Sequence, residues 1–201
     1  MTTIDKGQRR RDLLEHALAV FSEKGYHATK VEDIVSRAGV ARGTFYLYFE
    51  DKRATFTELL DSFVARLREA ILRINPQGPV RSQIRANVDR ALDLLLSERD
   101  FTRILLSHAV GIDPAFDRKL LDFYDAIAQM LERALALGHS MGLVRAHDFG
   151  LMAYALLGMV KEIAYRVVVA GYEVEPEHLA EQLLDQSLHG LLLREAAGVK
   201  A

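Results

Sequence analysis

Hydrophobic side chains recur at intervals of three and four residues along nearly the whole chain, which puts them on one side of an α-helix. No run of alternating Val, Ile and Thr lies between turn signals, so strands are not expected. The four prolines, Pro76, Pro79, Pro114 and Pro176, fall between these amphipathic stretches, where a fixed φ and a missing N–H mark helix boundaries. The pattern predicts an all-α protein of about nine helices.

The first part of the chain predicts three helices joined by short turns. The first runs over residues 8–24. Thr29 begins the second, and its hydroxyl and the Glu32 carboxylate are expected to form a capping box. Only residues 39–41 separate the second helix from a third one over residues 42–49. Two short helices joined by such a turn form a helix-turn-helix.

The third helix has two unlike sides. Phe45 and Phe49 fall on one side and are expected to be buried. The remaining side carries Arg42, Gly43, Thr44, Tyr46, Leu47 and Tyr48, although a merely solvated face would more naturally carry lysine and glutamate. Arginine can donate two parallel bonds to guanine and methyl groups can contact thymine, so this side suits a DNA groove. The alternative is that the aromatic residues belong to an ordinary core segment.

The segment 29–52, TKVEDIVSRAGVARGTFYLYFEDK, resembles the DNA-binding signature of the TetR family of bacterial transcriptional regulators. The resemblance covers roughly residues 8–60, and its AGV turn, aromatic core and following DK are specific in combination. Thr55 departs from the family, which commonly has leucine there. The resemblance implies that Lys30, Tyr48 and Lys52 hold phosphates. The full set of DNA-binding residues that it implies is Thr29, Lys30, Arg42, Gly43, Thr44, Tyr46, Leu47, Tyr48 and Lys52.

The resemblance also implies how the chain divides. Residues 1–50 would form the DNA-binding domain, and residues 51–201 would hold a linking helix, a ligand-binding domain and the dimer interface. A linking helix is expected over residues 51–74, before the helix-breaking segment Asn75–Pro79. Five further helices are predicted over residues 80–98, 100–110, 114–141, 146–170 and 176–196.

The apolar stripe of the helix over residues 114–141 is interpreted first as part of the core and second as the wall of a ligand pocket. The resemblance favours the wall, because the family's C-terminal helices enclose a small effector. We expect this effector to be hydrophobic and elongated or aromatic, with a fatty-acyl thioester of coenzyme A as one option. His108 and Tyr124 would be its polar anchors, although His108 also fits a satisfied core histidine. The predicted ligand-binding residues are Phe101, Arg103, Leu105, His108, Phe123, Tyr124, Met130, Phe149 and Met152.

The last two helices are apolar on more than one stripe, which a single subunit would leave partly uncovered. Two copies packed as a four-helix bundle would cover these stripes and set two reading helices about one DNA turn apart. An ordinary monomeric core is the alternative. The residues predicted for the dimer interface are Met159, Ile163, Val167, Leu184, Leu188 and Leu191.

Composition and residue spacing bear on metal binding, enzymatic activity and cellular location. The chain has no cysteine, and His139, His147 and Asp148 straddle a helix break, so neither a metal nor another cofactor is expected. No nucleophile with a base can be assembled, so an enzyme is not expected. Residues 1–53 hold ten Lys and Arg against eight Asp and Glu, which makes the DNA-binding end the positive one. With no secretory signal and no apolar segment long enough to span a membrane, a cytoplasmic protein is expected.

These observations predict a homodimeric repressor that binds a palindromic operator in double-stranded DNA and is released by a hydrophobic small molecule. The competing hypothesis is an all-α binding or carrier protein for hydrophobic small molecules. DNA affinity that falls steeply with salt would distinguish the repressor from the carrier.

Overall fold

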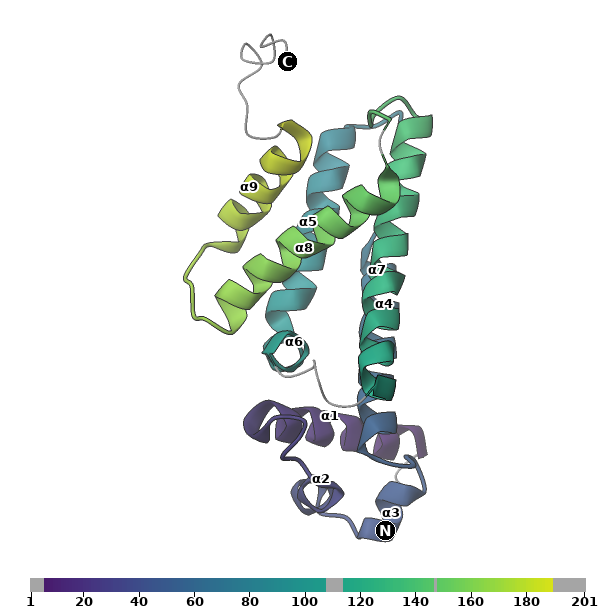
Figure 1. Cartoon of the computed structure of the whole chain (residues 1–201), viewed down its shortest axis with the longest axis vertical. Helices are drawn as coiled ribbons and strands as arrows, with labels where there is room; N and C mark the ends of the chain where they lie inside the picture. The colour runs from purple at the N-terminus through teal and green to yellow at the C-terminus, as the bar shows by residue number, and fades with distance from the viewer. Residues whose placement is uncertain (1–5, 108–113, 147, 190–201) are drawn as a thin grey trace.

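The computed structural model describes residues 6–107, 114–146 and 148–189, and the regular structure of these residues is entirely helical (Figure 1). The predicted all-α class is therefore confirmed. None of the described helices is long and apolar enough to cross a membrane. In chain order the helices are α1 (Lys6–Lys24), α2 (Val31–Ala38), α3 (Arg42–Tyr46), α4 (Lys52–Ala70), α5 (Val80–Ser97), α6 (Arg99–Ser107), α7 (Pro114–Ser140), α8 (Phe149–Val168) and α9 (Pro176–His189).

Helices α1 to α3 gather at one end of the molecule, and α4 leads from them alongside α7 towards the other helices (Figure 1). The Asp51 carboxylate caps α4 by accepting from the amide of Ala54 at 2.7 Å. Helix α4 ends earlier than predicted because Ile71 already has an extended backbone. Helix α3 is also shorter than predicted, since its last helical residue is Tyr46.

The main hydrophobic core continues from the helix-turn-helix into the C-terminal helices. Aromatic rings form much of this connection. Phe56 of α4 lies between Phe21 of α1, at 5.8 Å between ring centroids, and Phe101 of α6, at 6.5 Å. Phe101 stacks on Phe63 at 4.8 Å, and Phe63 contacts Phe123 of α7 at 6.0 Å. The expected division of the chain at residue 50 stays a prediction, because this core spans it.

A second, smaller core joins α5, α8 and α9. It contains or contacts residues that were predicted to form the dimer interface. Its buried members are Leu92, Leu179, Ala180 and Leu183, with Met159 and Ile163 packed against them. Val167 and Leu184 are also buried within the chain. These two side chains are therefore covered by their own subunit and have no face left for a partner. The side chain of Leu188 and all of Leu191 lie outside the described residues.

Candidate nucleic-acid interface

Helix α3 presents the surface that the sequence assigned to DNA. Phe45 and Phe49 are buried beneath it, as predicted. Leu47, the residue directly after α3, is 74% exposed, and its neighbour Tyr46 is 46% exposed. Gly43 is also exposed, and a Cβ added there would meet no atom within 4 Å. The outward side of α3 is thus an open surface of apolar and aromatic groups.

Arg42 opens this surface as the first residue of α3. Its Nη1 lies 2.7 Å from Oε1 of Glu32, and its Nη2 donates to the Tyr46 hydroxyl at 3.2 Å. The guanidinium also lies 5.6 Å from the centroid of the Tyr46 ring. The hydrogen bond to Tyr46, and then the Glu32 carboxylate, raise the pKa of Arg42 above its ordinary value. Arg42 is therefore a charged donor held on the exposed side of the helix-turn-helix.

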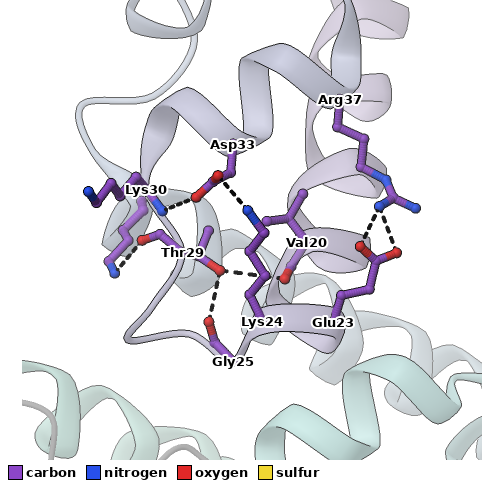
Figure 2. A network of polar contacts seen from close by, with 9 residues as sticks. Val20, Glu23, Lys24, Gly25, Thr29, Lys30, Asp33 and Arg37 are labelled. Atoms are coloured by element: carbon purple, nitrogen blue, oxygen red, sulfur yellow. Dashed lines mark hydrogen bonds and ion pairs between the residues drawn. The ribbon is translucent and has the colours of Figure 1, made fainter.

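The start of α2 differs by one position from the expected capping box (Figure 2). Lys30, not Thr29, is the residue before the helix, and its amide donates to Oδ2 of Asp33 at 2.8 Å. Thr29 is buried, and its hydroxyl donates to the carbonyl of Gly25 at 2.8 Å instead. The hydroxyl is drawn away because the carbonyls at the end of α1 need donors. Thr29 thus supports the turn between α1 and α2, and Glu32 is released from capping.

Asp33 also ties α2 to the first helix. Its Oδ1 accepts from Nζ of Lys24 at 2.6 Å, and the lysine hydrogen bond lowers the pKa of this carboxyl from its ordinary value. A second tie joins Arg37 of α2 to both carboxylate oxygens of Glu23, at 2.6 and 2.7 Å. Figure 2 shows both ties crossing from one helix to the other. They add polar contacts to the buried core that holds α2 against α1.

The structure corrects the phosphate role expected of Lys52. Its ammonium group donates to the carbonyls of Tyr26 at 2.8 Å, His27 at 3.1 Å and Thr29 at 2.7 Å. An ammonium group has three N–H donors, so all are occupied within the chain. Burial lowers the pKa of this group from its ordinary value. Lys52 holds the turn after α1 against α4, and it has no donor left for a phosphate.

Of the other residues predicted to bind DNA, Lys30 is exposed, whereas Thr44 and Tyr48 are half-buried. Tyr48 packs against the main core, and so only part of its side chain is open to a phosphate. Thr55, the departure from the family signature, is buried, and its hydroxyl donates to the Asp51 carbonyl at 3.0 Å. The threonine is accommodated because a carbonyl of the preceding turn satisfies its polar atom.

Arg10 has a role that sequence reasoning missed, since an arginine in a basic triplet near a chain end, here Arg9 to Arg11, is most often only solvated. Its Nη1 donates to the carbonyl of Tyr48 at 2.7 Å, and its Nε donates to Glu58 at 2.7 Å. The guanidinium also lies 4.5 Å from the centroid of the Phe49 ring. Arg10 therefore joins α1, the turn after α3 and α4. No local signal reveals this, because its partners are 38 and 48 residues away.

The predicted ligand-binding residues differ in burial. Phe101, Leu105 and Phe123 are buried in the main core beside α4. Tyr124 and Met130 of α7 are half-buried against the same core. Phe149 and Met152 of α8 are half-buried, Arg103 is exposed, and His108 lies outside the described residues. Burial raises the pKa of Tyr124 to about 12, and Lys161 of α8 lies 4.9 Å from its ring centroid.

One groove in the described part of the chain is lined by none of the described residues that were predicted to bind the ligand. This open groove has a volume of about 510 Å³ and lies between the start of α4 and α7, with a lining that includes Glu50, Arg53, Asp61 and Lys119. An effector pocket among the C-terminal helices stays a prediction. Within the described residues there is no group of three or more His, Cys, Asp or Glu placed to hold a metal.

Comparison with known proteins gives these features a family. The family described as "Bacterial regulatory proteins, tetR family" matches residues 13–59. The chain is 28% identical to an uncharacterized HTH-type transcriptional regulator, YdgC, of Bacillus subtilis, over 92% of its own length and 93% of that protein.

Two solved structures share the fold over nearly the whole chain. One is the fatty acid degradation regulator FadR from Bacillus halodurans, with a TM-score of 0.81 and 23% identity over 94% of this chain and 100% of that one. The other is the transcriptional regulator FadR from Bacillus subtilis in complex with stearoyl-CoA, with a TM-score of 0.78 and 21% identity over 90% of this chain and 99% of that one. The helix-turn-helix therefore matches that of the TetR family over residues 13–59, and along nearly its whole length the chain is similar to an HTH-type transcriptional regulator.

Proposed function

We propose that the protein is a DNA-binding transcriptional regulator, a repressor that binds a palindromic operator as a homodimer and is released by a hydrophobic effector. The observation that carries this proposal is the exposed surface of α3 and the residue after it, where Arg42 and Leu47 lie outside the buried rings of Phe45 and Phe49. Arginine and apolar groups on one short helix suit base edges and thymine methyls. A carrier protein has no use for such a surface.

The test of DNA reading is the variant Arg42→Ala. Duplexes are selected from a randomised pool by the wild-type protein, and affinity is then measured for every single-base change at several salt concentrations. Arg42→Ala should weaken the selected duplex by about 1–3 kcal/mol and relax preference at one base pair in each half-site. If the wild-type protein selects no sequence, or binds duplex DNA without a steep loss of affinity in salt, it is not an operator-binding regulator.

Lys30→Ala is the matched comparison, since Lys30 is also an exposed cation of the helix-turn-helix. As a phosphate contact it should weaken all duplexes alike and lower the salt slope by about one unit. Equal loss of base preference in the two variants would contradict the separate roles of Arg42 and Lys30.

The homodimer is supported by the outer face of α8. Leu151 is 67% exposed, and Ala155 and Gly158 continue the same side of this helix at intervals of four and three residues. Small residues let two helices approach closely, and a two-fold contact uses the same face on both subunits. The proposed interface is therefore this outer stripe of α8, in place of the inner stripe expected from the sequence.

The effector is supported by partly exposed apolar side chains among the C-terminal helices. Only Leu92 of the 18 residues of α5 is buried, while Ile84, Val88 and Leu95 stay half-exposed on a helix that packs against α4, α8 and α9. An apolar ligand that covered these side chains would gain free energy from the area removed from water. A relative of the same fold is named as a complex with stearoyl-CoA, so long-chain acyl-CoA is the first compound to test.

Calorimetric titration with stearoyl-CoA, in the presence and absence of the selected duplex, tests the coupling. An effector that releases DNA must bind the DNA-bound conformation more weakly, and the duplex must weaken effector binding by the same factor. We expect a fall in effector affinity of about 5- to 150-fold on adding the duplex. Equal affinity in the two titrations would mean that effector binding is not coupled to DNA.

A further inference from the structure

Glu32 is free to act outside the fold of its own helix. The cap of α2 is made by Asp33, and the contact that the structure gives the Glu32 carboxylate is the one to Arg42 at 2.7 Å. Both side chains are largely open to solvent, with 53% of Glu32 and 62% of Arg42 exposed. Such an exposed ion pair contributes little to stability, so this contact needs another explanation.

The ion pair and a hydrogen bond together favour one position of the long Arg42 side chain. Glu32 lies in the first turn of α2 and Arg42 is the first residue of α3, so the contact reaches across the turn of the helix-turn-helix. The Tyr46 hydroxyl holds Nη2 from the other side. A guanidinium has five N–H donors, and these two partners need only two of them. Three donors are left for a base, enough for a two-bond contact with guanine.

We propose that Glu32 is a specificity-determining residue that positions the Arg42 guanidinium for reading a base pair. The inference rests on the proposed function, in which Arg42 reads DNA. A freely rotating arginine can donate to a phosphate or to several neighbouring bases, whereas a held guanidinium presents its donors at one place. The Glu32 carboxylate also repels phosphates, so it lowers the affinity for DNA of any sequence. Its contribution is to the discrimination between base pairs.

Two variants of Glu32 distinguish its effect on the position of the Arg42 guanidinium from the effect of its negative charge. Glu32→Ala removes both the charge and the acceptor oxygens, whereas Glu32→Gln removes the charge and keeps one oxygen for the guanidinium. Neither change touches the cap made by Asp33, so the helix-turn-helix should stay folded, which circular dichroism checks. Glu50→Ala is the control. Glu50 is an exposed carboxylate in the turn after α3, and the structure gives no contact between it and Arg42.

The measurement is affinity for the selected duplex, for the duplex changed at the base pair that Arg42→Ala identifies, and for unrelated DNA. Glu32→Ala should lower discrimination at that base pair by about fivefold and raise affinity for unrelated DNA by about two- to threefold. Glu32→Gln should raise affinity for unrelated DNA equally while keeping most of the discrimination. Glu50→Ala should leave discrimination unchanged.

The proposal fails if Glu32→Ala discriminates as well as the wild type, because Glu32 would then only mask Arg42 or repel DNA. It also fails if Glu32→Gln discriminates no better than Glu32→Ala, since the carboxylate would then act through its charge. Failure of the proposed function looks different. In that case Arg42→Ala itself leaves discrimination intact at every position of the duplex.

Discussion

Replacing Phe101 with alanine is expected to lower the free energy of unfolding by about 3–5 kcal/mol, the usual cost of truncating a buried phenylalanine. Phe101 is 1% exposed and lies between Phe56 and Phe63 of α4 and Phe123 of α7. The cavity would open where the helix-turn-helix, the linking helix and the C-terminal helices share one core. Urea unfolding followed by circular dichroism, at one fixed protein concentration, measures the change.

Leu121→Ala is the matched control, because Leu121 is an apolar residue of α7 with 60% of its surface exposed. Its effect should stay within about 0.5 kcal/mol. The two variants also distinguish a role of Phe101 in the core from a role as the wall of an effector pocket. If this ring were mainly the wall of an effector pocket, Phe101→Ala would weaken ligand binding and change stability no more than Leu121→Ala does.

The second large effect is expected at Gly158, where glutamate should convert the dimer to monomer. A Cβ added at this position meets no atom within 4 Å in its own subunit, so the substitution leaves the fold of the single chain intact. Across a two-fold contact the new carboxylate appears twice, and burying each one without a partner costs several kcal/mol. Sedimentation should show monomer at micromolar concentration, and affinity for the selected duplex should fall by about 100-fold or more.

Leu72→Glu provides the control for the added charge. Leu72 follows α4, far along the chain from α8, and 53% of its surface is exposed. This variant should remain dimeric and bind the duplex like the wild type. If Gly158→Glu also remains dimeric, the outer face of α8 is not the subunit contact, whatever the affinity for DNA.

Local sequence was sufficient for the elements of the helix-turn-helix. The spacing of apolar residues determined that α1, α2 and α3 form and that Phe45 and Phe49 are buried, because side chains three and four residues apart share one side of a helix. The same reasoning identified the outward face of α3. It also gave the order of the later helices, whose ends are marked by proline, glycine and capping residues.

Competition between nearby polar groups was decided only in the folded chain. The sequence offered Thr29 and Glu32 as a capping pair, but Thr29 is drawn to the carbonyl of Gly25, and Lys30 and Asp33 take over the cap. A cap depends on which acceptors and donors the preceding helix leaves unsatisfied, and this depends on how α1 and α2 meet. The displacement by one residue is what frees Glu32 for Arg42.

What the sequence by itself determined is the helical periodicity, the buried and open sides of α3, and the family signature. What only the tertiary structure decided is the use of each charged and apolar group whose partner is distant in sequence. Lys52 is committed to three carbonyls of another turn, Arg10 to a helix 48 residues away, and Val167 to its own subunit's core. Helical spacing shows which side chains share a face, and the packing of helices decides what that face meets.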